Sequence, residues 1–208
     1  MDNVIYCDIE TVSGMNKPSA DDIKAPANYK DPIKIQEYQL TNVEEAWRKQ
    51  ALDSMKGEII CIGFAMGDGE IHVIHEATEQ ATIYAFANQI KLIQGQYHEV
   101  LKWCGWNIQT FDLPWLWRKA VQYGIGSLRD AIPKDNRNFI LDLMKIWSSD
   151  FKDYNSLESV AKFLGIKHEG GRGSEIHDLW QIGENGLIDD HCRRDIETVR
   201  EIHYRIGG

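Results

Sequence analysis

The sequence predicts an α/β domain in which a mixed central β-sheet is flanked by α-helices. Strand-like segments come first in the chain, and segments with helical spacing then alternate with further strands. Hydrophobic residues make up 43% and charged residues 26%, which is ordinary for a globular protein. The 208 residues suffice for a proper core but leave little room for a second catalytic domain. We therefore expect a single domain over residues 1–208.

The N-terminal part is expected to contain a strand, a long loop and a helix. Residues 3–10 are rich in β-branched and aromatic side chains, which is typical of a strand. Residues 13–39 contain three of the five prolines and little periodicity, which predicts a long loop or flap. Residues 41–55 begin with a cap-like Thr41 followed by two glutamates, and acidic residues suit a helix N-terminus.

The next part is expected to contain a hairpin, a helix and another strand. Residues 57–66 form a continuous apolar run, and residues 70–75 alternate in polarity after a Gly-Asp-Gly turn, which together predict a hairpin. Residues 78–93 have helical apolar spacing, and residues 99–106 return to strand character.

The C-terminal half is predicted to be mainly helical. The first of its helices covers residues 112–123 and tolerates Pro114 in its first turn. Three more helical segments, separated by glycine-containing breaks, cover residues 156–164, 175–182 and 187–206.

Charge, cysteines and hydropathy narrow the function classes. A net charge of −9 argues against a protein that coats long stretches of nucleic acid, although an enzyme that grips only a chain end stays compatible. The four cysteines are far apart and form no CxxC pair, so we expect buried reduced thiols. No apolar run approaches the length of a membrane span, and we expect no membrane association and a cytoplasmic location.

Two acidic residues near the end of the first strand are candidates for a metal site. Side chains two apart lie on the same face of a strand, so Asp8 and Glu10 present neighbouring carboxylates. The alternative is coincidence, because an Asp-x-Glu triplet is common by chance.

Two further segments carry candidate residues. Asp112 falls in the first turn of a helix, where it could equally be a simple N-terminal cap. His191 and Asp195 are four residues apart and therefore share one face of the last helix, where a solvated ion pair is the alternative.

Together and in this order, the three segments resemble the signature of the DEDD exonuclease superfamily. The resemblance is to the stand-alone relatives of the proofreading domain of family B DNA polymerases. It extends to the 57–63 and 156–165 segments, and spans nearly all of the chain apart from the 13–39 loop. It implies a ribonuclease H-like fold and a metal-dependent 3′-to-5′ exonuclease. The motif residues are Asp8, Glu10, Asn107, Phe111, Asp112, His191 and Asp195.

The resemblance also implies the site chemistry. Asp8, Glu10, Asp112 and Asp195 would hold two Mg²⁺ or Mn²⁺ ions, the cations that oxygen-only ligands favour. His191 would activate or position the attacking water, but it departs from the pattern. A histidine here stands at the spacing of the tyrosine subclass, so its subclass is open, and a helix-surface histidine is the alternative.

Substrate contacts are less sharply indicated. The resemblance suggests Asn107 and Phe111, and Trp106 could stack an unpaired base, although the tryptophans around Asp112 are mostly expected in the core. The glycine-rich segment 168–174 could bring Arg172 to a phosphate or be only a connector. Asp142 could support the site, with a structural role as the alternative.

The predicted reaction is release of nucleoside 5′-monophosphates from the 3′ end of DNA, with single strands preferred because no basic face for a duplex is evident. The same chemistry on short RNA is an alternative, since sugar choice depends on contacts with the 2′-hydroxyl. A catalytically silent nuclease-fold module is the rival from another class. Any polymerase or replication partner would be a separate chain, and the oligomeric state is open.

Overall fold

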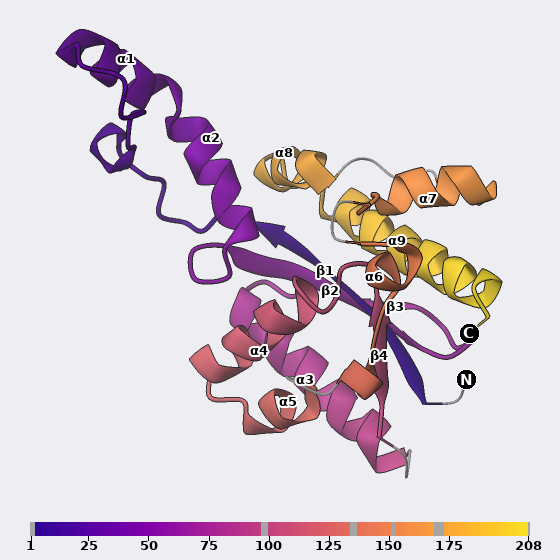
Figure 1. Cartoon of the computed structure of the whole chain (residues 1–208). Helices are drawn as coiled ribbons and strands as arrows, with labels where there is room; N and C mark the ends of the chain where they lie inside the picture. The colour runs from indigo at the N-terminus through magenta and orange to yellow at the C-terminus, as the bar shows by residue number, and fades with distance from the viewer. Residues whose placement is uncertain (1–2, 97–99, 134–136, 151–152, 169–172, 208) are drawn as a thin grey trace. The chain divides into compact units, whose positions relative to one another are not determined.

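The computed structural model describes residues 3–96, 100–133, 137–150, 153–168 and 173–207 (Figure 1). The chain divides into two compact units. The smaller unit is Thr11–Glu58, and the larger unit combines Met1–Glu10 with Ile59–Gly208.

A mixed β-sheet of five strands is the centre of the fold. The pair β2–β3 is antiparallel, whereas β1–β4 and β4–β5 are parallel, and the strand order is β3-β2-β1-β4-β5. The predicted mixed sheet is therefore confirmed. The strands are β1 (Val4–Val12), β2 (Glu58–Met66), β3 (His72–Ile74), β4 (Lys102–Gly105) and β5 (Ile140–Asp142).

Helices cover the sheet on both faces, in agreement with the predicted class (Figure 1). The five helices expected after residue 77 are all present, whereas α5, α6 and β5 were not predicted. The helices are α3 (Glu79–Gln96), α4 (Asp112–Gln122), α5 (Gly126–Ala131), α6 (Leu143–Trp147), α7 (Leu157–Leu164), α8 (Ile176–Gln181) and α9 (Asn185–Arg205), with 3₁₀ turns at η3 (Arg137–Phe139) and η4 (Gly173–Glu175).

The alternation of side chains along β1 decides which core each residue joins. Ile5, Cys7 and Ile9 pack in a cluster with side chains of α3, α4 and α5. Val4 and Tyr6 pack instead in a cluster with α6, α7 and α9. Because the side-chain period of a strand is two, the even-numbered residues that follow also face α9.

A glycine permits close packing of α9 against β2. A Cβ atom at Gly63 would lie 2.6 Å from Cδ1 of Ile196 and 2.7 Å from Sγ of Cys192, closer than real Cβ contacts allow. The missing side chain therefore lets the middle of α9 approach the strand directly.

The smaller unit differs from the sequence prediction. A loop or flap was expected over residues 13–39, but the structure contains η1 (Ala20–Asp22) and a helix α1 (Pro32–Thr41). Asp31 caps α1 by accepting a hydrogen bond from the backbone N–H of Ile33 (2.9 Å), with proline at the first helical position. None of its residues is buried, so the apolar periodicity that reveals a helix is missing.

The helix predicted over residues 41–55 is also divided. Its first part is α2 (Val43–Arg48), which continues as the 3₁₀ turn η2 (Lys49–Leu52). Asn42 separates α2 from α1, with non-helical backbone angles of φ −99° and ψ 3°. Its side-chain amide donates to the carbonyl of Tyr38 (2.7 Å), which stabilises the break.

The four cysteines are buried and free, which confirms the expected reduced thiols. Within the described parts of the chain, no helix is both long enough and apolar enough to cross a membrane.

Candidate active site

Strand β1 brings Asp8 and Glu10 to the face of the sheet that α9 covers. They follow Val4 and Tyr6 in the two-residue alternation, and both of those pack against the α9 side. Glu10 is buried, with 7% of its surface exposed, while Asp8 is half-buried. The predicted sharing of one face by these two carboxylates is consistent with this arrangement.

Asp112 reaches the same strand from the start of α4. Its Oδ1 accepts a hydrogen bond from the backbone N–H of Ile9 (3.1 Å), and the residue is buried. Asp112 is the first residue of α4 rather than its N-cap, and this bond joins it to β1. The N-terminal cap alternative therefore does not describe its main contact.

The turn before α4 fixes that approach. Asn107 has a positive φ of 59°, and its carbonyl accepts hydrogen bonds from the backbone of Thr110 (3.1 Å) and Phe111 (3.0 Å). Asp142 supports the same turn by accepting from the backbone N–H of Gln109 (3.1 Å). Asp142 also caps α6, so its structural role is the one that these contacts support.

Helix α9 supplies His191 and Asp195. Nδ1 of His191 forms a hydrogen bond with Oε1 of Glu10 (2.8 Å) and lies 3.9 Å from Oδ1 of Asp195. His191 is only 6% exposed, so the alternative of a helix-surface histidine is wrong. The pair of His191 and Asp195 is present at 3.9 Å, but it is not the solvated pair of the alternative, because His191 is buried and its closer partner is Glu10.

The four carboxylates form one electrostatic cluster. Burial is the main cause that raises the pKa of Asp8 well above its usual value, and the charges of the other three carboxylates raise it further. Burial also raises the pKa of Asp112, to about 8. The pKa values of Glu10 and Asp195 are raised by burial too, although in both cases His191 acts in the opposite direction.

This cluster fits divalent cations. Oδ1 of Asp195 is buried and accepts no hydrogen bond from any described residue, and the His191 and His168 rings approach it only to 3.9 Å. A buried carboxylate oxygen without a donor is costly, and a cation would offset that cost. Carboxylate oxygens are the ligands that Mg²⁺ and Mn²⁺ prefer.

Two residues near the cluster were not predicted from the sequence. His168 places Nε2 3.9 Å from Asp195 and forms a hydrogen bond through Nδ1 with Oγ1 of Thr198 (2.9 Å). Cys192 donates through Sγ to the carbonyl of Asp8 (3.7 Å), and its sulfur groups with the carboxylates of Asp8 and Glu10. No local sequence signal marks either residue.

The residues predicted to contact substrate do not form a cluster as the four carboxylates do. Trp106 is half-buried and donates through Nε1 to the carbonyl of Asn155 (3.2 Å), while Phe111 packs on Trp115 with ring centroids 5.7 Å apart. Arg172 lies outside the described residues. Trp103 and Trp115 are buried in the core, as expected for most of the tryptophans.

Comparisons with known proteins give a family and a fold. A family model described as RNase_H superfamily matches residues 49–204. Among solved structures, the family B DNA polymerase from the hyperthermophilic archaeon Pyrobaculum calidifontis is similar, with a TM-score of 0.63 and 15% sequence identity. The match covers 98% of this chain but only 24% of the polymerase chain. No curated protein matches the sequence.

Proposed function

The chain belongs to the RNase H superfamily, and we propose that it is a 3′-to-5′ exonuclease that hydrolyses phosphodiester bonds at the 3′ end of single-stranded DNA. The ribonuclease H-like fold predicted from the sequence is confirmed by the family match and the similar structure. That fold is a nuclease fold, but polarity, substrate and mechanism belong to the proposal.

One observation carries the proposal most directly. Four carboxylates from three separate elements lie close enough for their charges to interact. As a consequence, the charges of Glu10, Asp112 and Asp195 raise the pKa of Asp8. Gathering four acidic groups, two of them buried and two half-buried, opposes folding unless something compensates their charge. A pair of divalent cations at a nuclease centre is such a compensation.

In this proposal, the residues of the cluster have the following roles. Asp8, Glu10, Asp112 and Asp195 would hold two Mg²⁺ or Mn²⁺ ions, which supply water activation and charge stabilisation at phosphorus when bound. The backbone N–H of Ile9 fixes Asp112. Water attacks the terminal phosphodiester, the P–O3′ bond breaks, and a nucleoside 5′-monophosphate leaves.

His191 has a more specific role in this proposal than the sequence suggested. The sequence motif favours a general base or water positioner. The hydrogen bond to Glu10 (2.8 Å) instead supports a positioning residue that holds the Glu10 carboxylate toward the cluster. Outer contacts of this kind orient metal ligands and tune their affinity.

Substrate contacts are proposed only for the segment that leads into α4. Asn107, Phe111 and Trp106 belong to this segment, whose last residue precedes Asp112. An aromatic face beside the carboxylates would stack the terminal base, which is worth about 1 to 3 kcal/mol.

A labelled oligonucleotide tests the proposal. With Mg²⁺ or Mn²⁺, a 5′-labelled single-stranded DNA should give a descending ladder, whereas a 3′-labelled strand should release labelled mononucleotide at once. The Asp8→Ala protein should give neither product. If this variant cleaves DNA as fast as the unaltered protein, the assignment is wrong. A matched RNA strand in parallel shows which sugar is preferred.

Metal binding separates the nuclease from a silent module of the same fold. Calorimetric titration should show Mn²⁺ binding in the unaltered protein and weaker binding in Asp8→Ala. Absence of Mn²⁺ binding together with absence of cleavage would favour the silent module.

A further inference from the structure

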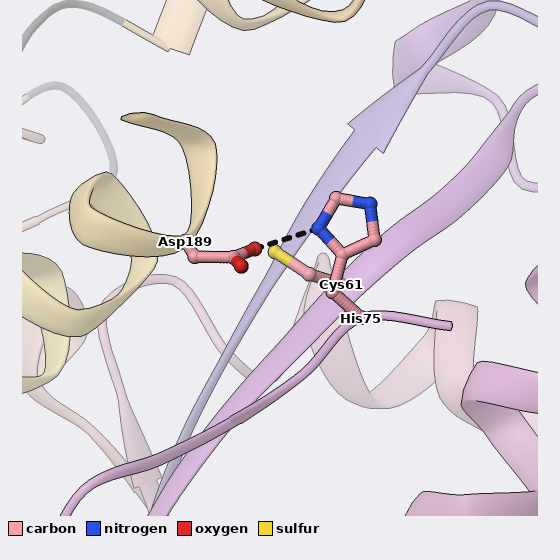
Figure 2. Close-up of side chains that lie close together, drawn as sticks. All are labelled: Cys61, His75 and Asp189. Carbon is pink, nitrogen blue, oxygen red and sulfur yellow. Dashed lines mark hydrogen bonds and ion pairs between the residues drawn. The ribbon is translucent and has the colours of Figure 1, made fainter. Parts of the chain in front are cut away.

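A second group of potential metal ligands lies outside the four carboxylates. Cys61 comes from β2, His75 directly follows β3, and Asp189 comes from α9 (Figure 2). One ligand atom from each residue lies within 4.8 Å of the other two. Nδ1 of His75 and Oδ1 of Asp189 are 2.6 Å apart, and Figure 2 shows the Cys61 sulfur turned toward this contact.

The donor chemistry of this group differs from that of the carboxylate cluster. A thiolate, an imidazole nitrogen and a single carboxylate are the ligands that zinc takes in proteins, usually in tetrahedral geometry. Mg²⁺ prefers oxygen ligands and would gain little from Cys61 or His75. Three protein ligands leave a fourth position for water.

The burial of the three residues is graded. Cys61 is fully buried, whereas the side chains of His75 and Asp189 are 15% and 33% exposed. An ion could therefore reach the group from solvent past His75 and Asp189, with the sulfur as the innermost ligand. A metal site needs both a defined donor set and such a route.

The fold explains why the three donors meet. The absence of a side chain at Gly63 lets α9 pack closely on β2, and β2 pairs with β3 through Ile62 and Ile74. The residues next to this pair in sequence are Cys61 and His75. Packing and register thus place both beside the first half of α9, where Asp189 lies.

We propose that Cys61, His75 and Asp189 form a site for Zn²⁺, separate from the carboxylate cluster. The ion replaces the proton between His75 and Asp189 and binds the Cys61 sulfur as thiolate, and both displaced protons pass to solvent. A hydrogen bond accounts for His75 and Asp189, and Cys192 is a partner for the Cys61 side chain, but neither contact requires the three donor atoms to converge within 4.8 Å. The proposal stands whether or not the chain is a nuclease.

Cobalt is a suitable probe because Co²⁺ takes zinc positions and gives a thiolate-to-metal absorption band that oxygen ligands do not give. The full-length protein, with excess Mg²⁺ present, should bind one equivalent of Co²⁺ with this band, and Zn²⁺ should abolish the band. The variants His75→Gln and Asp189→Asn should bind Co²⁺ at least tenfold more weakly. Both side chains are partly exposed, so these variants should fold, which circular dichroism checks.

Matched controls locate the ion. His72→Gln and Asp190→Asn change exposed neighbours and should bind Co²⁺ as the unaltered protein does. Cys61→Ser should remove the absorption band, whereas Cys192→Ser should keep it. The proposal is overturned if the unaltered protein gives no band, or if His75→Gln and Asp189→Asn leave it unchanged. Loss of the band only in Cys192→Ser would place the ion with Asp8 and Glu10 instead.

Discussion

The two groups of potential ligands differ in chemistry although α9 contributes to both. The carboxylate cluster combines acidic residues from β1, α4 and α9 and contains a buried oxygen to which none of the described residues donates a hydrogen bond. The Cys61–His75–Asp189 group combines sulfur, nitrogen and oxygen, and His75 and Asp189 already satisfy each other. Cys61 and Cys192 join the two groups through a hydrogen bond between their side chains.

The two groups differ in how much negative charge must be compensated. The carboxylate cluster has an excess of negative charge, which only cations or protons can offset. The second group contains a single carboxylate, and that carboxylate already has a hydrogen-bond partner in His75, so the group does not depend on an ion to offset clustered negative charge. We therefore expect changes in the first group to have the larger effects.

The largest expected effect follows from changing a carboxylate of the cluster. Asp195→Asn should lower the rate of DNA cleavage on the order of 10³-fold, because transition-state stabilisation by the cations is worth several kcal/mol. The Co²⁺ absorption band should remain. Asp190→Asn, an exposed neighbour on α9, should cleave normally. Loss of the band in Asp195→Asn would show that the two groups are not separate.

A smaller effect is expected from His191, and it distinguishes two roles. If His191 holds Glu10, His191→Gln should raise the Mg²⁺ concentration for half-maximal activity about 10- to 100-fold, with the rate largely recovered at high Mg²⁺. If it removes a proton from water, the rate should stay low at saturating Mg²⁺. Activity measured across a Mg²⁺ titration decides between them, with His72→Gln as the control.

The metal-free protein should lose stability as pH rises. The pKa of Asp112 is about 8 in the folded chain and 3.8 ordinarily, so the folded state holds a proton that the unfolded state has lost between these values. Stability is then fully present below pH 3.8 and falls as pH rises toward 8. The melting temperature should fall by about 3 to 5 °C per pH unit for this one proton.

Thermal denaturation in a chelator from pH 5 to 8.5 measures this slope. Asp112→Asn should have a shallower slope, because its amide does not titrate. Saturating Mg²⁺ should reduce or reverse the slope in the unaltered protein, since the cations bind the ionised carboxylates. Identical slopes for both proteins without metal would contradict the assigned charge state of Asp112.

Local patterns predicted the parts of the fold with clear periodicity. The two-residue alternation of β1 indicated that Asp8 and Glu10 share a face, and apolar spacing predicted α3. Helix α1 has no buried residue and so lacks the apolar spacing of a packed helix, and β5 is a three-residue strand without the turn signal that precedes the equally short β3. The sheet order beyond the hairpin also depends on contacts between distant segments.

Local sequence patterns predicted less of the candidate site than of the fold. Each acidic motif was ambiguous alone, and only their ordered combination pointed to one site. The contact between His191 and Glu10 depends on how α9 is rotated against β1, across 181 residues of sequence. His75 and Asp189 are 114 residues apart, and no spacing rule connects them to Cys61. Such groups become visible only when the strands and α9 are placed in space.

The smallest predicted effect is the sharpest test of the difference between the two groups. Asp189 and Asp195 lie on the same helix, but Asp189 faces His75, whereas Asp195 lies near His191 and His168. Asp189→Asn should therefore change the rate of DNA cleavage with saturating Mg²⁺ by less than about twofold, the range of a typical surface substitution. It should at the same time remove the stabilisation by Zn²⁺, seen as a rise in melting temperature. A large loss of Mg²⁺-dependent cleavage in Asp189→Asn would mean that the Cys61–Cys192 contact couples the two groups.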